Sequence, residues 1–384
     1  MTQAPAPDER RPVLVYRDRI GVASELEFSR RQYLGFRTLR PVWIGRKVMP
    51  DSGRISTETI RIGGLRGLLF RYFGLAPSLD LSPFVPVVHA QFARGGALAL
   101  PLARAMSAKL VVTLHGGDVG KDKNWHHTVL SRRWPEVIAQ TYRFVCVSGA
   151  VAETAARRGA PAHLLTVLPI GVPVPATPPM AARDGTLLFA GRFVEKKGIV
   201  VLAEAMRRLR ASGDGTKLVC AGDGPLRPVL EALARDVSGV ALSGWLSPHD
   251  LAARMDTALG LVVPSIVAAD GDAEGLPSVV PEAMARGCVV IGSDEGGIAE
   301  AVIDDGTGLL AAPGDPSALA AAMHRLHAEP ALAERLAQAA FVDVGTRLNA
   351  SQQSAVLETI LLEAAEQRPV RWGRSASGPG AART

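Results

Sequence analysis

Short apolar runs alternate with amphipathic stretches along most of the chain, and this alternation predicts parallel strands joined by helices. In the first half, strands are expected at Val13–Tyr16, Val42–Ile44, Val85–His89, Leu110–Leu114, Phe144–Val147 and Leu165–Leu168. Helices are expected between several of these strands, including Gly96–Met106 and Ala150–Arg158. Because parallel strands need crossover connections, which are usually helices, these elements indicate a doubly wound α/β sheet.

A proline-rich segment then interrupts the pattern. Four prolines fall within residues 173–179 and can continue neither a helix nor a central strand, so residues 173–184 are expected to form a linker. After the linker the pattern restarts, with strands at Leu187–Ala190, Lys217–Ala221, Val240–Leu242, Leu259–Val263 and Val289–Gly292, and with helices at Ile199–Ala211, Leu226–Ala234, Pro248–Met255, Ser278–Arg286, Pro316–His327 and Ser351–Glu366.

Two doubly wound halves on either side of a linker predict two domains with a ligand-binding cleft between them. We expect a first domain at 1–172 and a second at 185–348. A helix at 349–367 is expected to cross back to the first domain, and the polar, Gly/Ser-rich tail at 368–384 is expected to be disordered.

Composition narrows the class of protein. The chain has 384 residues, of which 47% are apolar and 21% charged, and these values exclude a largely disordered, collagen-like or coiled-coil chain. Its three cysteines are scattered and predict neither a disulfide framework nor a cysteine-rich zinc site. No secretory signal and no run of roughly 18 apolar residues is found, so a cytoplasmic location is expected.

Charge is distributed unevenly between the two halves. Residues 1–170 carry 24 basic and 12 acidic side chains, a net charge of +12, whereas residues 171–384 carry 19 and 25, a net charge of −6. This asymmetry suggests that the two domains have different partners. The basic half could face nucleic acid, anionic lipid or an acidic substrate, but no nucleic-acid-binding motif accompanies it, so nucleic acid is not expected.

The segment Glu274-Gly-Leu-Pro-Ser-Val-Val-Pro-Glu282 is the strongest candidate site. Its two glutamates bracket a helix start at Ser278, where free N–H groups favour anions. Two carboxylates in this arrangement can hold hydroxyls at separate points of a ligand whose phosphates lie between them. The alternative is one surface carboxylate and one carboxylate near a helix start, with no ligand.

Further motifs lie at other strand ends. In Gly191-Arg192 to Lys197-Gly198, glycines allow close backbone approach and two cations suit a diphosphate, although a solvated basic loop would look the same. The turn at 222–224 is a weak signal by itself. His115, in Thr113-Leu-His-Gly-Gly-Asp118, could hydrogen-bond a sugar hydroxyl or a phosphate, or could be a buried structural histidine.

Together these motifs, in this order, resemble glycosyltransferase family 4 from about Val87 to Pro313. The resemblance implies a retaining nucleotide-sugar transferase of GT-B fold, which has two Rossmann-like doubly wound domains facing each other across a cleft. The segments 88–96, 113–118 and 264–277 look like the branch that builds bacterial exopolysaccharides, including colanic-acid-type enzymes. The first domain would then be the acceptor side, and the second would bind the nucleotide sugar.

The resemblance also implies roles for single residues. His115 and Glu274 would approach the transferred sugar and are the expected catalytic residues; Arg192 and Lys197, with Ser278, would bind the donor diphosphate; Glu282 would bind the ribose; Gly244, Trp245 and Leu246 would lie at the base; and Gly191, Gly275 and Leu276 would shape the donor loop. Gly296-Gly297 and Glu300 match a recurrent segment whose role stays open. The sequence shows no clear candidate for a nucleophile, and the resemblance implies a front-face reaction in which the leaving diphosphate helps to deprotonate the acceptor hydroxyl.

Asp270-Gly-Asp272 resembles a metal-binding pair, but it lies on a loop of a fold that generally works without metal, so no metal and no other cofactor is expected. The implied partners are a nucleotide sugar and an acceptor that is either a saccharide or a saccharide linked to polyprenyl diphosphate. The basic, aromatic stretch 61–73 could contact the cytoplasmic face of the inner membrane, or could be an ordinary amphipathic helix. The alternatives are a sugar-nucleotide epimerase, a related sugar-phosphate or storage-glucan synthase, and a non-catalytic partner subunit.

Overall fold

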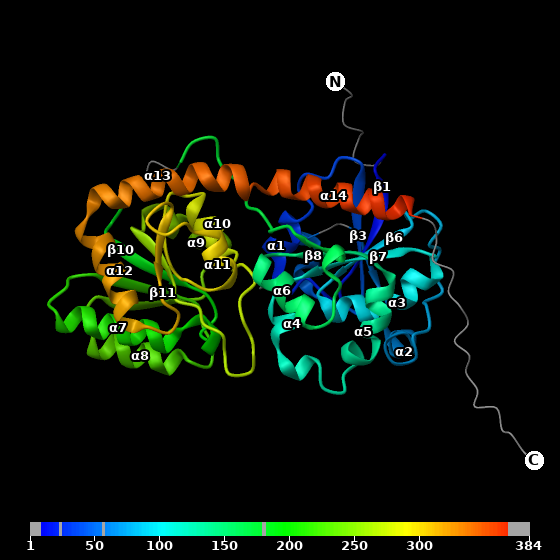
Figure 1. Cartoon of the computed structure of the whole chain (residues 1–384), viewed down its shortest axis with the longest axis horizontal. Coiled ribbons are helices and arrows are strands. Elements are labelled where there is room, and N and C mark those ends of the chain that lie inside the picture. Colours follow the sequence, from blue (N-terminus) through cyan, green and yellow to red (C-terminus); the bar gives the residue numbers. More distant parts are fainter. Residues whose placement is uncertain (1–8, 23–24, 56–57, 179–181, 368–384) are drawn as a thin grey trace, which may run out of the picture.

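Two fully parallel sheets form the framework of the computed structural model, which describes residues 9–22, 25–55, 58–178 and 182–367. The N-terminal sheet has the order β5-β3-β1-β6-β7-β8-β9, and the C-terminal sheet has the order β12-β11-β10-β13-β14-β15. Figure 1 shows them as separate halves, each with helices on both faces of its sheet. The predicted α/β class with two Rossmann-like units is therefore confirmed, whereas the tail expected at 368–384 lies outside the described residues.

The N-terminal half is built mainly as the apolar pattern predicts. Its strands are β1 (Arg11–Tyr16), β3 (Leu39–Gly45), β5 (Thr59–Arg61), β6 (Val87–Gln91), β7 (Lys109–Leu114), β8 (Thr141–Cys146) and β9 (Leu165–Val167), with β2 (Arg19–Ile20) and β4 (Lys47–Val48) as a separate pair. Its helices are α1 (Leu26–Arg31), α2 (Gly64–Leu68), α3 (Ala93–Ala105), α4 (Gly117–Gly120), α5 (Val129–Gln140) and α6 (Gly149–Arg157).

Most predicted helix ends lie within two residues of the observed ones, but the start of α3 differs by three residues. The helix expected to begin at Gly96 begins at Ala93, directly after β6. Phe92 has a φ of 69°, which is uncommon for a residue with a side chain, and this conformation turns the chain from strand into helix without a loop. The predicted start at Gly96 was wrong because periodicity does not reveal so abrupt a turn.

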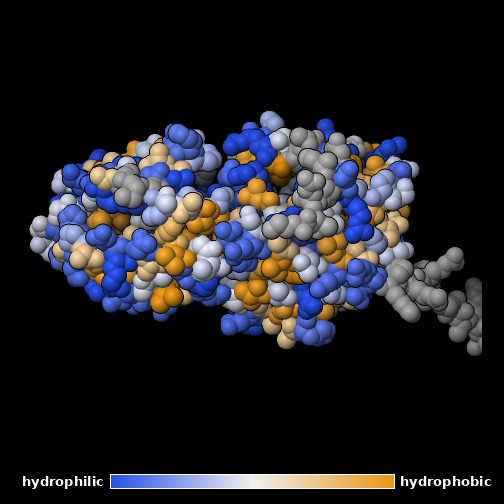
Figure 2. All heavy atoms as spheres, turned by 90° about the horizontal axis from the view of Figure 1, so that it is seen from above, coloured by the Kyte–Doolittle hydropathy of each residue, from blue (hydrophilic) through white to orange (hydrophobic). Residues whose placement is uncertain are grey.

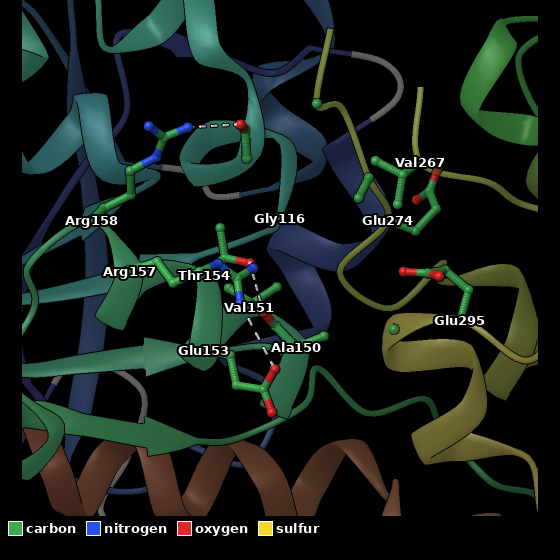
Figure 3. Close-up of a pocket in the computed structure, with 14 residues that line it drawn as sticks. Gly116, Ala150, Val151, Glu153, Thr154, Arg157, Arg158, Val267, Glu274 and Glu295 are labelled. Carbon is green, nitrogen blue, oxygen red and sulfur yellow. Dashed lines mark hydrogen bonds and ion pairs between the residues drawn. The ribbon is translucent and has the colours of Figure 1, made fainter. Parts of the chain in front are cut away.

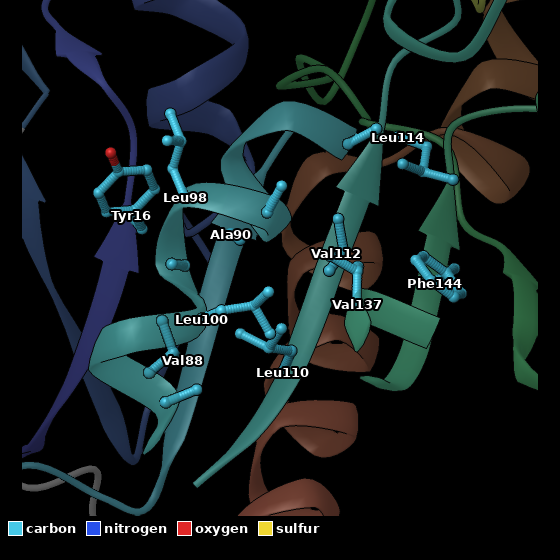
Figure 4. Packing of buried hydrophobic residues seen from close by; sticks show 14 of the residues in the cluster. Tyr16, Val88, Ala90, Leu98, Leu100, Leu110, Val112, Leu114, Val137 and Phe144 are labelled. Atoms are coloured by element: carbon cyan, nitrogen blue, oxygen red, sulfur yellow. The ribbon is translucent and has the colours of Figure 1, made fainter. Parts of the chain in front are cut away.

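Apolar side chains on the strands and on α3 and α5 fill the core of this half. Figure 4 shows Leu98 of α3 beside Tyr16 of the sheet, and Leu100 of α3 beside Val88 and Leu110. All five side chains are almost inaccessible to solvent. Burying such side chains stabilises the fold by about 1.5–3 kcal/mol each, and it fixes the sheet that carries the strand ends discussed below.

The C-terminal half repeats the design. Its strands are β10 (Thr186–Ala190), β11 (Lys217–Ala221), β12 (Val240–Gly244), β13 (Gly260–Val263), β14 (Val289–Ser293) and β15 (Gly308–Ala311). Its helices are α7 (Ile199–Ala211), α8 (Arg227–Asp236), α9 (Pro248–Thr257), α10 (Val279–Met284), α11 (Gly296–Ala301), α12 (Pro316–Ala328) and α13 (Pro330–Arg347). Separate apolar clusters pack on the two faces of its sheet, which is the arrangement that a parallel sheet requires.

The last helix, α14 (Ala350–Glu366), leaves the C-terminal half and lies against the N-terminal one (Figure 1). Its Leu357 and Leu361 share an apolar cluster with Tyr33 and Trp43 of the N-terminal half. The carboxylate of Glu358 accepts hydrogen bonds from the backbone N–H groups of three consecutive residues at 37–39, at distances between 2.6 and 3.1 Å. The N-terminal core is therefore completed by the C-terminal end of the described chain.

The outer surface of the molecule is mixed in character. Figure 2 shows polar and apolar side chains interspersed over both halves on the face that it presents. Over the described residues, no helix is both long enough and apolar enough to cross a membrane.

Candidate active site

The loop after β13 brings the two halves together. Its residue Glu274 forms an antiparallel backbone bridge with Gly116, which follows β7 of the other half. A Cβ atom on Gly116 would lie 2.6 Å from the nitrogen of Gly275, and one on Gly275 would lie 2.4 Å from the carbonyl oxygen of His115. Larger residues would force the strands apart, so the two glycines allow the predicted catalytic residues His115 and Glu274 to lie on neighbouring segments.

Glu274 is held between two lysines. Its Oε1 atom lies 3.1 Å from Nζ of Lys197 and 3.4 Å from Nζ of Lys196, and its side chain is only 15% exposed. Burial alone would raise the pKa of Glu274, but the two ammonium groups outweigh burial and hold the pKa below its usual value. The residue is therefore a carboxylate at neutral pH. Lys197, expected at the donor diphosphate, is paired with this carboxylate, and sequence analysis gave Lys196 no role.

Lysines also neutralise the acidic pair that resembles a metal site. Asp272 contacts Lys121 at 2.6 Å and Lys196 at 3.2 Å, and Asp270 contacts Lys123 at 3.2 Å. Lys121 and Lys123 belong to the N-terminal half, so these ion pairs connect the two halves. Over the described chain, no group of three or more His, Cys, Asp or Glu side chains is arranged to hold a metal ion.

The His115 ring packs against both Phe92 and Phe28, with centroid distances of 4.2 and 5.1 Å. Burial, with a smaller contribution from Arg17, lowers the pKa of His115 to about 3, so the ring is neutral at physiological pH. Its Nε2 atom is 2.9 Å from Oε1 of Gln91. Because that oxygen can only accept, the proton lies on Nε2 and the Nδ1 atom is left as an acceptor.

Asp118 positions the backbone around His115. Its carboxylate accepts hydrogen bonds from the N–H groups of His115 and Ala93, at 2.9 and 2.8 Å. Burial raises the pKa of Asp118 above its usual value, against the effect of these hydrogen bonds. Asp118 belongs to the quoted histidine motif, but sequence analysis assigned it no function of its own.

In the part of the chain that the structure describes, no hydrogen bond or ion pair joins the three residues expected at the diphosphate. Arg192 is solvent-exposed, and within the described residues it makes no side-chain ion pair or hydrogen bond. Gly191 lies close to Lys197, because a Cβ atom on this glycine would be 3.5 Å from the lysine Cε atom. The hydroxyl of Ser278 makes no capping hydrogen bond, and α10, which follows it, has only six residues.

Glu282 reaches the other half of the molecule. Its Oε1 atom accepts a hydrogen bond of 2.6 Å from Nη1 of Arg31, the last residue of α1. Sequence analysis did not identify Arg31, because a contact over 251 positions leaves no local signal in the sequence.

The predicted base-binding segment lies at the end of β12. Gly244 ends the strand with a φ of +71°, in the left-handed region that favours glycine. The Trp245 ring after it is 59% exposed, whereas Leu246 packs on the apolar cluster of the C-terminal half. An exposed ring at a strand end offers a flat apolar face on which a base can stack.

A cavity of about 590 Å³ lies on one side of the loop after β13 (Figure 3). Side chains of α6, including Glu153, Thr154 and Arg157, face Glu274 and Glu295 across it. Of the predicted site residues, only Glu274 lines this cavity; the predicted residues absent from its lining are His115, Arg192, Lys197, Ser278, Glu282, Gly244, Trp245, Leu246, Gly191, Gly275 and Leu276. Glu274 is thus common to the cavity and to the lysine cluster.

Glu300, whose role the sequence left open, spans the same junction. Its carboxylate accepts hydrogen bonds from the N–H groups of Gly149 and Ala150, at 2.7 and 2.8 Å. These are the first two residues of α6, so a carboxylate of the C-terminal half caps a helix of the N-terminal half. The negative charge also complements the positive end of the helix dipole.

Comparison with known proteins gives matches over both halves. Residues 65–174 match the family described as Glycosyltransferase Family 4, and residues 178–342 match Glycosyl transferases group 1. The chain is 31% identical over 270 residues, 67% of its length and 65% of the relative's, to the amylovoran biosynthesis glycosyltransferase AmsK of Erwinia amylovora. It is 31% identical over 266 residues to a glycogen synthase of Mycobacterium tuberculosis, covering 66% of the chain and 63% of the relative.

The fold also matches solved structures. The structure of Anabaena Alr3699/HepE in complex with UDP superposes with a TM-score of 0.74, covering 92% of this chain and all of that one, at 15% sequence identity. The chain spans just under two thirds of the length of the two relatives above.

Proposed function

Since the chain belongs to glycosyltransferase family 4, we propose that it transfers a sugar from a nucleotide diphosphate sugar to a saccharide acceptor with retention of the anomeric configuration. The observation that carries this proposal is the position of Glu274. Its carboxylate lies at the junction of the two halves, beside Lys197, and its backbone is bridged to Gly116, the residue after His115. Donor and acceptor would meet at this point.

In this proposal the chain positions the reactants and stabilises charge. Lys197 and Arg192 offset the negative charge that grows on the leaving diphosphate. Neutral His115 cannot neutralise that charge, so it acts through hydrogen bonds to the sugar. Glu274 fixes the sugar, Glu282 the ribose, and the segment at 244–246 the base. The leaving diphosphate accepts the proton of the acceptor hydroxyl, so no protein nucleophile is needed.

For the acceptor we propose a lipid-linked saccharide of bacterial cell-surface polysaccharide synthesis. The similarity to an amylovoran biosynthesis glycosyltransferase supports a cell-surface product, whereas the similarity to a glycogen synthase favours a storage glucan. The surface of α2 and the following turn, Leu69–Phe73, favours the first. Leu65 and Phe73 are 71% and 74% exposed there, beside the exposed Arg61 and Arg66. Such a surface suits peripheral contact with the cytoplasmic face of the inner membrane.

We propose further that the reaction needs no metal. The two aspartates of the Asp270-Gly-Asp272 segment form ion pairs with lysines. The lysines already neutralise the negative charge that a divalent cation would need in order to bind.

The test is a panel of UDP- and GDP-sugars incubated with purified protein, with and without a saccharide acceptor and with a chelator present. We expect transfer of one sugar with retained configuration, measured by NMR of the product. Arg192→Ala and Lys197→Ala should each lower the rate at subsaturating donor by about 10- to 150-fold, the loss of one charge-assisted hydrogen bond. Lys217→Ala is the matched control, because Lys217 begins β11 and lies at the amino ends of the strands, whereas Arg192 and Lys197 follow the carboxyl end of β10.

Three outcomes would contradict the proposal. Conversion of the nucleotide sugar into its epimer without an acceptor would indicate the epimerase alternative. Binding of nucleotide sugars without turnover would indicate a non-catalytic partner subunit. Complete loss of activity with the chelator, restored by manganese, would reassign Asp270 and Asp272 to a metal site.

A further inference from the structure

Arg31 occupies an unusual position for a charged side chain. Its guanidinium lies between the halves of the molecule, and its side chain is 12% exposed. Nη1 donates to Glu282 at 2.6 Å, and Glu27 lies 3.7 Å from Nε. The Nε atom is nevertheless buried without a hydrogen-bond partner. A buried donor without an acceptor costs free energy, so this site is incompletely satisfied as it stands.

The carboxylate that Arg31 contacts is the one assigned above to the donor ribose. A ribose held by Glu282 places its hydroxyls within hydrogen-bond distance of that carboxylate, and the diphosphate is attached to the same ribose. A guanidinium 2.6 Å from Glu282 Oε1 therefore lies within reach of the nucleotide. A guanidinium presents several N–H donors in a planar fork that matches phosphate oxygens.

We propose that Arg31 binds the nucleoside diphosphate of the donor, as a contribution from the N-terminal half to a site otherwise built by the C-terminal half. This inference rests on the proposed function and adds a residue to it. When the nucleotide is bound, its phosphate oxygens accept from Arg31, including the unsatisfied Nε, and its ribose takes the place of Arg31 at Glu282. Donor binding thus exchanges an ion pair between the halves for contacts that both halves make to one ligand.

The sign of one mutational effect tests the proposal. If the Arg31–Glu282 pair only holds the halves together, it competes with the ribose, and Arg31→Ala leaves nucleotide affinity unchanged or raises it. If Arg31 binds phosphate, Arg31→Ala weakens binding of UDP or GDP by about 10-fold or more. Uridine or guanosine, which lack phosphates, should lose little affinity. Isothermal calorimetry with these four probes measures the difference directly.

Two further variants complete the experiment. Arg30→Ala is the matched control, since Arg30 is the preceding residue of the same helix and pairs on its exposed side with Glu27. Arg31→Lys keeps the charge without the planar fork and should bind the diphosphates with intermediate affinity. Circular dichroism establishes that each variant is folded.

The outcomes separate this inference from the function on which it rests. Failure of the wild-type protein to bind any nucleoside diphosphate would overturn the proposed function. Binding by the wild type, with equal or tighter binding of UDP and GDP by Arg31→Ala, would overturn only the role of Arg31. An equal loss for nucleosides and diphosphates would also overturn it, because a phosphate contact cannot act on a ligand without phosphate.

Discussion

The pKa values of single side chains at the junction of the two halves depend strongly on how deeply the side chains are buried. His115 has the ordinary chemistry of an imidazole, yet burial lowers its pKa to about 3. His89 is fully buried beside Tyr33 and Thr113, and burial lowers its pKa to about 3 as well. The sequence predicts a histidine at a strand end, but the lowered pKa could not be predicted from it. The burial of His115 depends on packing against Phe28 and Phe92, which are distant from His115 in the sequence.

The first prediction concerns pH. The folded pKa of His115 is below the unfolded value of about 6.5, so only the unfolded state takes up a proton between roughly pH 6.5 and pH 3. Stability should therefore fall as the pH drops through this range, by about 1.4 kcal/mol per pH unit for each such histidine. In His115→Gln, the slope of the unfolding free energy against pH should be smaller by the contribution of about one proton. Urea unfolding at pH 7, 6 and 5 measures this slope. An unchanged slope would mean that His115 is protonated in the folded protein.

At the scale of elements, the sequence shows strands and helices well but shows poorly what joins them. Buried strands such as Leu110–Leu114 are apolar throughout and stand out in the sequence. The strand β5 has three residues with one charged side chain, too short to give a pattern. The contact of Glu300 with α6 depends on how the two halves are placed, so only coordinates could assign that glutamate a cap.

The second prediction concerns α2 and the turn that follows it. If this surface contacts an anionic bilayer, the protein should sediment with vesicles containing about one third anionic lipid, and added salt should weaken the binding. The double variant Leu65→Ser/Phe73→Ser should lose most of the binding. Val342→Ser is the control, because Val342 is an exposed apolar residue on α13 of the other half. Equal binding of both variants would remove the membrane role from this surface.

For the whole molecule, the sequence pattern predicted the class of fold because each strand, helix and glycine turn agrees with one architecture. The contacts between the two halves were harder to predict from the sequence. Ion pairs such as Lys121–Asp272 and Arg31–Glu282 form only when two separately folded sheets meet. The site residues could therefore be nominated from local motifs and from a family resemblance, whereas the partners of those residues could not.

The third prediction tests the attachment of α14. Glu358→Ala would leave three backbone N–H groups without their acceptor, and we expect a loss of about 2–4 kcal/mol of stability, since hydrogen bonds to a charged group contribute about 1.5–3 kcal/mol each and do not add fully. Fluorescence of the buried Trp43, in the same cluster as α14, should report unfolding of the N-terminal half at lower urea. A parallel loss in the C-terminal half would indicate a single cooperative unit instead.

The place of α14 has a consequence for the order in which the protein is made. A ribosome releases residues 9–172 long before it reaches Leu357 and Leu361, which complete the cluster around Tyr33 and Trp43. The apolar face of the nascent N-terminal half therefore stays exposed to solvent while about half of the chain is still being synthesised. During this interval the growing chain offers a surface to chaperones, and the first half of the protein finishes folding only after α14 has been synthesised.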